Sequence, residues 1–540
     1  MTVRRRGWLR SPLFLLAVTA GLAALVVQSG ELGSSDTMHR LQTAHSFWTS
    51  EPPVFPQEYP EFGVHGRGGK LYDWYGIGQP LLMLPADIVG TYLERLAIFE
   101  DYDGNDPSVR NIVVSYSTNL LINVLTALVC FRFLLSLSFT SRQAVAGVLA
   151  LLFCTTHLHY TQNMMENNYI MLLTLAGFAF QYDWLRSGSR RALLIGSAAL
   201  GLNLLTRLTT GLDLLAVAFF LLLVSWFERV RDRALWERVV LYCKTALPVY
   251  AVFVLIDRIY QYHRFGSFFD TYVHSFALEH RLLDPSLPPD YPFETPFRVG
   301  FFGALFTPEK SIFLFDPLLV LTIALAALAW KRLRPEMRAY IITVFLLLLA
   351  YICFYAKYTV WSGDFAWGDR YVSTAAELGA FIAVPLLLRY RADLGKFVWR
   401  IGVALVAVSA TIQLASLAFW LPLEIYQMET LGHPTFVIAL RFRNIVAFAL
   451  GKMDAWGLKN YAMKQDAWDY VHITTWNFLP FVLRRVGEAP AWVVRVCCAL
   501  WIAGLAALAW TLWRLYQVVS ANHYNADAAA SDPATALRRA

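Results

Sequence analysis

Apolar residues in this chain gather into blocks about as long as a bilayer is thick. A helix needs roughly 17–25 residues to cross the hydrocarbon core. Only 16% of the residues are charged, whereas a soluble domain carries roughly a quarter. The sequence therefore predicts an all-α integral membrane protein with about 12 transmembrane helices. The expected spans are about 12–29, 112–136, 143–160, 167–185, 191–206, 211–227, 239–259, 312–330, 338–356, 371–389, 399–420 and 491–513.

Basic residues between these blocks predict the orientation of the chain. Cytoplasmic loops are enriched in Lys and Arg, and here these residues gather in every second short connection. Both termini are therefore expected in the cytoplasm, with 1–11 as a basic N-terminal segment, and the net charge of +7 reflects topology rather than nucleic-acid binding. The first block is expected to stay as an anchor, because VVQSGELGSSD is a poor cleavage site. The basic clusters are Arg4, Arg5, Arg6 and Arg10; Arg186, Arg190 and Arg191; Arg229, Arg231 and Arg233; Lys331, Arg332 and Arg334; Arg389, Arg391 and Lys396.

The long connections then lie together on the outer side of the membrane. They cover about 30–111, 260–311 and 421–490. Within them, Ile77–Ile98 and Phe436–Leu450 are apolar but interrupted by Pro, Asp or Arg, which predicts helices lying on the membrane surface.

Several sequence features limit the possible chemistry. All six cysteines lie in apolar blocks, which favours neither a disulfide framework nor a zinc site. Neither GxGxxG nor a Walker sequence is present. Because an outer-face enzyme has no access to cytoplasmic nucleotides, its activated substrate would arrive through the bilayer, most simply as a lipid-linked intermediate. The tail 514–540, rich in Ala, Asn and Asp, is expected to be disordered.

Asp36 is the first candidate site residue, a few residues beyond the first span. It opens the helical segment DTMHRLQTAHSFW and has His39 and Arg40 at helical spacings i+3 and i+4. Two interpretations stay open. Either Ser35 or Asp36 is a helix N-cap, or Asp36 is a general base at the membrane interface, oriented by a nearby cation.

Glu166 is the second acid, in the stretch TTHLHYTQNMMENN where the third span ends. His157 and His159 lie before it. A polar rim at the membrane interface is the more common explanation. His157 and Glu166 are the metal alternative, but His-x-His followed by Glu seven residues later is not a strong zinc spacing. We therefore expect no metal or cofactor, with a divalent metal left as an open alternative.

Two further stretches combine basic and aromatic residues. GRGGKLYDWYGIGQPLLMLP contains Arg67 and Lys70, which suit an anion, and Tyr72 and Tyr75, which serve either as interface aromatics or as sugar platforms. Glycines there allow close backbone approach.

YTVWSGDFAWGDRY contains Trp361, Trp367 and Arg370. An arginine at this depth suits a lipid phosphate, while an aromatic belt with an ordinary Asp–Arg pair is the simpler alternative. Arg207 and Asp213 flank another turn and are expected to pair with each other.

Five stretches in order resemble motifs of the GT-C superfamily of polyprenyl-phosphate-sugar-dependent glycosyltransferases, which includes relatives of the protein O-mannosyltransferases and aminoarabinose transferases. SSDTMHRLQTA carries the acid after the first span. GGKLYDWYGIGQPLLMLP is similar to GxYYxxYPPGxPLLLxP, and YHRFGSFFDTY to NxxxFGSPxxTGY. FFGALFTPEKSIFLFDPLLVL is similar to GLLFSPGRGLFLYSP, and WSGDFAWGDRYV to WxGGxxWGxRYL. Together they span residues 35 to 371, about two thirds of the chain.

The resemblance implies an inverting transfer from a polyprenyl-phosphate sugar to a hydroxyl acceptor, at the outer face of a bacterial cytoplasmic (inner) membrane. Residues 12–420 would form the catalytic module, with Asp36 as the base of the first loop. Glu166 would be the second acid, contacting acceptor or sugar, and Arg370 would neutralise charge on the departing phosphate. The last two spans, 399–420 and 491–513, and the 421–490 loop match nothing in the family.

The chain also departs from the family pattern. Relatives place a cation and a proline where Trp74, Tyr75 and Gly76 stand, so the phosphate role moves to Lys70, Arg67 or Arg370. Phe268 replaces the usual Pro, and the SPGRG stretch reads TPEKS. The Asp-Glu pair of the mannosyltransferases is missing from the first loop. These differences leave the sugar unassigned and argue against mannosyl transfer of that specific type.

Two other classes of protein fit a chain with this many spans. A secondary transporter or lipid flippase would show repeated halves and charges at mid-membrane. No repeat is evident, and the acids singled out lie at the outer boundary. A non-catalytic scaffold is disfavoured by Asp36 in its motif context. Glycosyltransferase is the favoured function and transporter the alternative.

Overall fold

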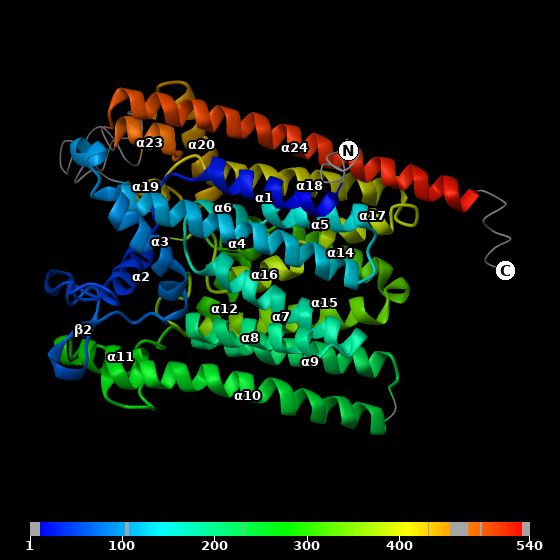
Figure 1. The fold of residues 1–540 in the computed structure, drawn as a ribbon, viewed down its shortest axis with the longest axis horizontal. Coiled ribbons are helices and arrows are strands. Elements are labelled where there is room, and N and C mark those ends of the chain that lie inside the picture. The colour runs from blue at the N-terminus through cyan, green and yellow to red at the C-terminus, as the bar shows by residue number, and fades with distance from the viewer. Residues whose placement is uncertain are drawn as a thin grey trace, which may run out of the picture.

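The computed structural model describes residues 11–102, 107–230, 232–364, 366–429, 431–453, 474–486 and 489–531. Each of the twelve apolar blocks contains helix, and most of the long helices run side by side (Figure 1). They are α1 (Pro12–Val27), α4 (Val109–Ser136), α5 (Ser141–Cys154), α6 (His157–Gln162), α7 (Asn167–Ser187), α8 (Arg190–Thr206), α9 (Gly211–Phe227), α10 (Asp232–Phe265), α14 (Leu318–Ala329), α15 (Pro335–Tyr355), α16 (Ser373–Ala380), α17 (Ala383–Arg389), α18 (Gly395–Ser416) and α24 (Ala491–Ser531).

Shorter elements fill the connections between these helices. A two-residue antiparallel pair, β1 with β2, aligns Val64 with Tyr72. The elements are α2 (Ser35–Ser46), η2 (Pro56–Glu58), β1 (Val64–His65), η3 (Arg67–Gly69), β2 (Leu71–Tyr72), α3 (Gly78–Glu94), η4 (Ala97–Tyr102), η5 (Leu208–Thr210), α11 (Tyr272–Leu283), α12 (Phe297–Phe306), α13 (Ile312–Phe315), η6 (Trp330–Arg332), α19 (Pro422–Glu429), α20 (Val437–Ala449) and α23 (Leu479–Arg485).

Six helical segments within the described residues are long and apolar enough to cross a membrane. The chain is accordingly a multi-pass membrane protein, whereas the full number of twelve crossings stays a prediction. The six are Val109–Ser136, Leu208–Phe227, Arg233–Phe265, Pro335–Tyr355, Gly395–Ser416 and Ala491–Ala521.

Two of the expected continuous spans are broken for a local reason. The block 312–330 divides into α13 and α14 at Asp316–Pro317, and 371–389 divides into α16 and α17 just before Pro385. Proline has no N–H to donate and its ring clashes with the preceding turn, so a helix is interrupted on its N-terminal side.

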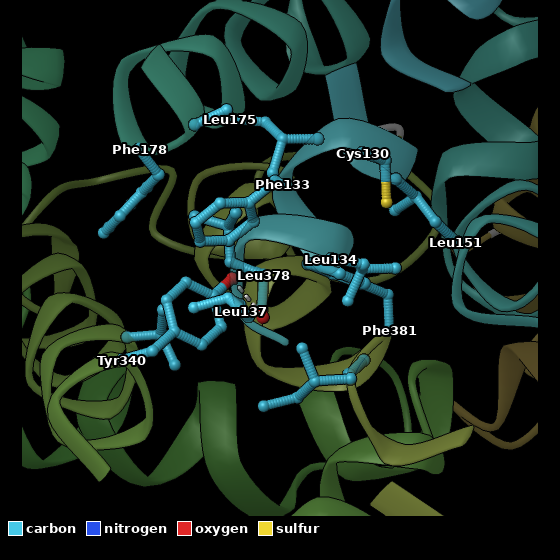
Figure 2. Packing of buried hydrophobic residues seen from close by; sticks show 14 of the residues in the cluster. Cys130, Phe133, Leu134, Leu137, Leu151, Leu175, Phe178, Tyr340, Leu378 and Phe381 are labelled. Atoms are coloured by element: carbon cyan, nitrogen blue, oxygen red, sulfur yellow. Dashed lines mark hydrogen bonds between the residues drawn. The ribbon is translucent and has the colours of Figure 1, made fainter. Parts of the chain in front are cut away.

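Aromatic and aliphatic side chains from several helices form the core. Phe133 on α4 lies with its ring centroid 5.2 Å from that of Tyr340 on α15 and 6.1 Å from that of Phe178 on α7. These edge and tilted contacts suit aromatic quadrupoles, and Leu134, Leu137 and other apolar side chains surround them (Figure 2). The hydroxyl of Tyr340 donates to the carbonyl of Leu378 at 2.9 Å, which joins α15 to α16. Packing in this core fixes the relative positions of the helices that carry the candidate active site.

The long connections gather at one end of the bundle. Figure 1 shows α2, β2, α3 and α11 at the end opposite the start of α1 and the α9–α10 connection, and α24 finishes at that second end. The basic short loops and the long loops are thus separated as the sequence predicts, although which end faces the cytoplasm stays a prediction. The expected surface segments are helical, as α3 and α20.

The prediction of a disordered tail from 514 is wrong for most of its length. Helix α24 continues to Ser531, and residues 532–540 lie outside the described part. Alanine has the highest helix propensity, and the run of Ala after Tyr516 extends a helix that the last span has already nucleated.

Candidate active site

Asp36 is free to act as a site residue because another side chain caps its helix. The Ser34 hydroxyl accepts from the backbone N–H of Thr37 at 3.3 Å, and Ser34 is the N-cap of α2. The expectation that Ser35 or Asp36 is the cap is therefore wrong. Asp36 lies in the first turn of α2, where the helix dipole favours a negative charge.

The Asp36 carboxylate joins three of the sequence motifs. Its Oδ1 accepts from the Tyr75 hydroxyl at 2.6 Å, and its Oδ2 accepts from Arg370 Nη1 at 2.5 Å. The guanidinium of Arg40 lies over the Tyr75 ring, 4.0 Å from its centroid. The side chains of Asp36 and Arg370 are 15% and 14% exposed, so both still reach solvent or a bound molecule.

The surroundings keep Asp36 ionised. Burial raises the pKa of this carboxyl, but the charges of Arg370 and Arg40 and the hydrogen bond from Tyr75 outweigh that effect. The net result is a pKa well below the ordinary value of an aspartic acid. Burial acts in the opposite sense on Arg370, yet the charge of Asp36 leaves its pKa well above the ordinary value.

Glu166 is held between two arginines. Arg40 and Arg207 each make an ion pair with one of its oxygens, and Arg207 Nε also donates to it at 3.1 Å. Burial raises the pKa of Glu166, but the charges of Arg40 and Arg207 lower it by more. The net pKa is below the ordinary value of a glutamic acid, so the group is ionised.

The predicted pairing of Arg207 with Asp213 is wrong. Arg207 pairs with Glu166 instead, and Asp213 accepts hydrogen bonds from Thr174, Asn203 and Tyr351 at 2.8 to 3.0 Å. Asp213 is close to Arg207 in sequence, which suggested the pairing, but Glu166 is the acid that Arg207 contacts.

The five charged groups carry an excess of positive charge. Three guanidiniums, from Arg40, Arg207 and Arg370, face two carboxylates, from Asp36 and Glu166, so the formal sum is +3 − 2 = +1. Arginine forks suit phosphate oxygens in bidentate geometry. This arrangement can hold an anion beside an ionised carboxylate.

The loop that carries Arg370 is held in place by side chains that donate hydrogen bonds to its backbone carbonyls. Asn167 Nδ2 donates to the Arg370 carbonyl at 2.6 Å, and Lys310 Nζ donates to the carbonyls of Asp364 and Ala366 at 2.7 and 2.9 Å. Gly363 has φ +76°, and a Cβ there would lie 2.6 Å from Arg370 Cγ. The glycine is required where the arginine side chain folds back over the loop.

Two residues that the sequence interpretation missed hold the Tyr75 segment in place. Arg264, fully buried at the end of α10, donates through Nη1 to the Tyr75 carbonyl at 3.1 Å and to Asp73 Oδ1 at 3.1 Å. Thr43 Oγ1 donates to the other Asp73 oxygen at 2.5 Å. Arg264 lies in the YHRFG motif and Asp73 in LYDWY, so the charges inside those motifs were the available signal.

Lys310 is another missed residue, inside the TPEKS sequence that replaces SPGRG. Burial lowers the pKa of its ammonium group to about 8. Its contacts to the carbonyls of Asp364 and Ala366 place a cation against the loop of Arg370.

The remaining predicted residues lie outside the Asp36–Glu166 network. Arg67 and Lys70 are exposed near the β1–β2 turn, with the Arg67 guanidinium 5.6 Å from the ring centroid of Tyr262. Tyr72 packs edge-on against His263, and the His39 ring lies 4.1 Å from that of Phe62. Their roles as phosphate or substrate contacts stay predictions.

Three further candidates lie deeper in the protein. Trp361 lies next to Gly303. His157 and Trp367 are fully buried, His157 against Asn123 and Trp367 against His159. In this conformation His157 and Trp367 pack within the protein, and the roles of all three residues as substrate contacts stay predictions.

The 421–490 segment contacts this site through Trp367. Arg441 and Glu424, both fully buried, form a bidentate pair at 2.7 Å, and the Arg441 guanidinium lies 5.3 Å from the Trp367 ring centroid. Arg441 also donates to the carbonyl of Ser416 at 2.5 Å. Helices α19 and α20 thus contact the loop of Arg370 at Trp367.

Metal binding finds no obvious place among the described residues. No three His, Cys, Asp or Glu side chains in that part of the chain are grouped as a metal site requires, and both oxygens of Glu166 are occupied by arginines.

Comparisons with known proteins identify distant structural relatives. No protein-family model matches the chain, and no curated protein matches it. ArnT from Cupriavidus metallidurans, bound to undecaprenyl phosphate, is 13% identical with a TM-score of 0.41, over 96% of this chain and 79% of that one. The Archaeoglobus fulgidus oligosaccharyltransferase tethered with an acceptor peptide is 15% identical with a TM-score of 0.47, over 81% and 55%.

A third solved structure is the archaeal oligosaccharyltransferase AglB from Archaeoglobus fulgidus, in complex with an inhibitory peptide and a dolichol-phosphate. It is 15% identical with a TM-score of 0.38, over 76% of this chain and 56% of that one. The structures that this chain is similar to are thus ArnT and archaeal oligosaccharyltransferase. At these identities and scores the likeness says nothing about the chemistry of the chain, which has to follow from its own residues.

Proposed function

We propose that this chain is an inverting glycosyltransferase. It moves a sugar from a polyprenyl-phosphate donor to a hydroxyl acceptor at the outer face of the cytoplasmic membrane, for a cell-envelope glycan, lipid or protein. The observation that carries the proposal is the contact between Asp36 and Arg370, a carboxylate and a guanidinium from motifs 334 residues apart.

Asp36 is the general base in this proposal. A base has to be ionised before it accepts a proton, and the charges around Asp36 keep it so. The acceptor oxygen forms a bond to the anomeric carbon as the bond from that carbon to the phosphate oxygen breaks, with its electron pair going to the phosphate. The acceptor proton passes to Asp36 late in this step, because a carboxylate of low pKa is a weak base toward an intact hydroxyl.

Arg370 stabilises the departing phosphate. Its Nη1 holds Asp36, Nη2 makes only a 3.5 Å contact to the Tyr371 hydroxyl, and Nε has no hydrogen-bond partner among the described residues. One guanidinium can therefore hold the base on one edge and receive phosphate oxygens on another. Preorganised charge of this kind often contributes most to a rate.

Glu166 organises the remaining cations. Because both of its oxygens accept from arginines, it is poorly placed to take a proton itself. It fixes the guanidiniums of Arg40 and Arg207 beside the base, and the excess positive charge offsets the charge of an incoming donor phosphate.

The bilayer supplies the donor in this scheme. Asp36 lies nine residues beyond the end of α1 and at the end of the bundle that collects the long loops. A polyprenyl chain stays in the hydrocarbon region while its phosphate reaches the boundary, so the sugar is presented at the level of Asp36.

Analysis of a deletion strain tests this function and names the substrates. Mass spectrometry of polyprenyl-phosphate sugars and envelope glycans should reveal an accumulated donor and one missing sugar. Expression of wild type in this strain should return the donor to its normal level and restore the missing sugar. Glu61→Gln, a change in an exposed acid of the same loop, should do the same, and Asp36→Asn should do neither. Unchanged donor and glycans in the deletion strain would reject the proposal.

Transport is the second candidate, and one observation favours it. Glu377 Oε2 and His157 Nδ1 are buried 3.9 Å apart and lack hydrogen-bond partners among the described residues. Ionisable groups inside a membrane are typical of ion pathways. Ion-coupled uptake into proteoliposomes by wild type, lost in Glu377→Gln, together with no sugar transfer by either protein, would favour a transporter.

A further inference from the structure

A second possible binding site lies apart from Asp36, beside the start of α24. A cavity of about 260 Å³ is lined by Phe448, Thr475, Trp476, Phe481, Arg484 and Arg485. This volume is below the roughly 300–1,000 Å³ of pockets for drug-sized ligands, so it suits a small head group better than an oligosaccharide.

The cavity lies at the level where the apolar helices end. The backbone N–H of Leu479, at the start of α23, donates to the carbonyl of Gln28, one residue beyond α1. Phe481 packs its ring 5.7 Å from that of Trp501 on α24, and Trp501 Nε1 donates to the carbonyl of Val26 at 2.8 Å. Figure 1 shows α23 at the same end of the bundle as α2 and α3.

The lining combines two cations with an aromatic wall. Trp476 packs its ring 4.7 Å from that of Phe448, and Phe481 adds a third ring to the lining. Arg484 and Arg485 are exposed, and within the described residues no carboxylate is within 4.0 Å of either guanidinium. Arg485 Nη1 makes a 3.3 Å contact to the carbonyl of Thr474, which leaves its other donors available.

The position of these arginines calls for an anionic partner. They lie at the end of the bundle opposite the basic connections, where the distribution of Lys and Arg in membrane proteins disfavours positive charge. Arginine forks recognise phosphate oxygens, and aromatic side chains suit the boundary between head groups and acyl chains.

We infer that this cavity binds the phosphate head group of an anionic bilayer phospholipid. Arg484 and Arg485 contact the phosphate, while Phe448, Trp476 and Phe481 contact the glycerol and the first acyl carbons. The lining of this cavity shares no residue with the site proposed for the donor. The inference does not depend on sugar transfer.

Titration of the detergent-purified full chain with short-chain phosphatidylglycerol tests this site. Arg484→Gln/Arg485→Gln should raise the Kd about tenfold or more, since two charged contacts are lost. Arg484→Lys/Arg485→Lys should raise the Kd by less than the double Gln variant does, because the charge is retained while the forked geometry of the guanidinium is lost. Arg298→Gln, at an exposed arginine near the start of α12, is the matched control and should leave the Kd unchanged. If the double Gln variant does not purify, the single variants provide the same comparison.

The probes also distinguish the possible ligands. Short-chain phosphatidylcholine should bind at least tenfold more weakly, and inorganic phosphate at millimolar concentration should not displace phosphatidylglycerol. An unchanged Kd in the double Gln variant, or equal binding of the two phospholipids, would overturn the inference. Displacement by inorganic phosphate, or binding of undecaprenyl phosphate in place of phosphatidylglycerol, would overturn it as well.

Discussion

Arg264 donates from its guanidinium to the main-chain carbonyl of Tyr75 at 3.1 Å, and the side chain of Tyr75 donates to Asp36. A buried arginine at the end of α10 therefore positions the hydroxyl that orients the proposed base. The same guanidinium contacts the Asp73 carboxylate at 3.1 Å, and both side chains are almost fully buried. Tyr75 depends on this pair for its place in the site.

Loss of one partner should destabilise the protein more than loss of both. Arg264→Gln leaves Asp73 charged and buried, and removal of one member of a buried pair costs about 3–5 kcal/mol. Thermal unfolding in detergent should show a large drop in Tm. Arg264→Gln combined with Asp73→Asn should recover part of it. A double variant less stable than Arg264→Gln would contradict this account of the pair.

The pH dependence of transfer should reflect the Arg370 charge on Asp36. The pKa of Asp36 in the folded protein lies below the ordinary value of about 3.9. The ionised form is therefore fully present above pH 4 and is lost only as the pH falls through the lower, folded value. In Arg370→Gln, the acid limb of residual kcat/KM should move up by about 1–3 pH units. An acid limb at the same pH in both proteins would show that Arg370 does not act on Asp36.

Donor affinity should distinguish the three candidate phosphate-binding cations. Arg370→Gln should raise the donor KM about tenfold or more and leave the acceptor KM within about twofold, because the contact is made to the phosphate. Arg67→Gln and Lys70→Gln, at exposed positions near the β1–β2 turn, provide the comparison. A larger rise in the donor KM in either of these variants would assign the phosphate contact to the first loop.

Gly363 should be needed for the placement of Arg370. Gly363→Ala imposes a positive-φ cost of about 1–2 kcal/mol and places a methyl group 2.6 Å from Arg370 Cγ. Gly395→Ala is the matched control, because Gly395 has φ +70° with no atom within 4 Å of the added Cβ. Both variants should lose similar stability, but only Gly363→Ala should lose kcat/KM. Equal activity in the two variants would show that the glycine serves the backbone alone.

The sequence predicted the helices better than it predicted their interruptions. Apolar blocks of bilayer length mark each long helix, because the pattern depends only on local composition. The break at Pro317 has a local signal as well, whereas the break at Thr155, between α5 and α6, depends on tertiary contacts of Thr156 with Asp316 and Glu377. The length of α24 was missed because polar composition was given more weight than alanine propensity.

The site was predicted as separate residues and not as a network. Asp36, Glu166, Tyr75 and Arg370 each stood out by charge or motif context, and the structure brings all four together with Arg40. Pairing was not predictable, because whether Arg207 meets Glu166 or Asp213 depends on how α7 and α8 approach each other. Lys310 was missed because its partners are main-chain carbonyls that no sequence pattern marks. Arg264 was missed although its charge and that of its partner Asp73 stand inside two of the motifs.

Turnover by Asp36→Asn, with the purified chain and a polyprenyl-phosphate sugar once that donor is identified, tests the central claim most directly. Asn keeps the size of the side chain and removes the charge, and loss of a general base lowers a rate by roughly 10²–10⁴-fold. The account predicts a loss of that size in kcat. Because Asp36→Asn leaves Arg370 without its charged partner, its Tm should fall below that of wild type and of the control Glu61→Gln, so kcat is compared at a temperature where all three proteins are folded. A correctly folded Asp36→Asn protein that turns over the donor at the wild-type rate would contradict it.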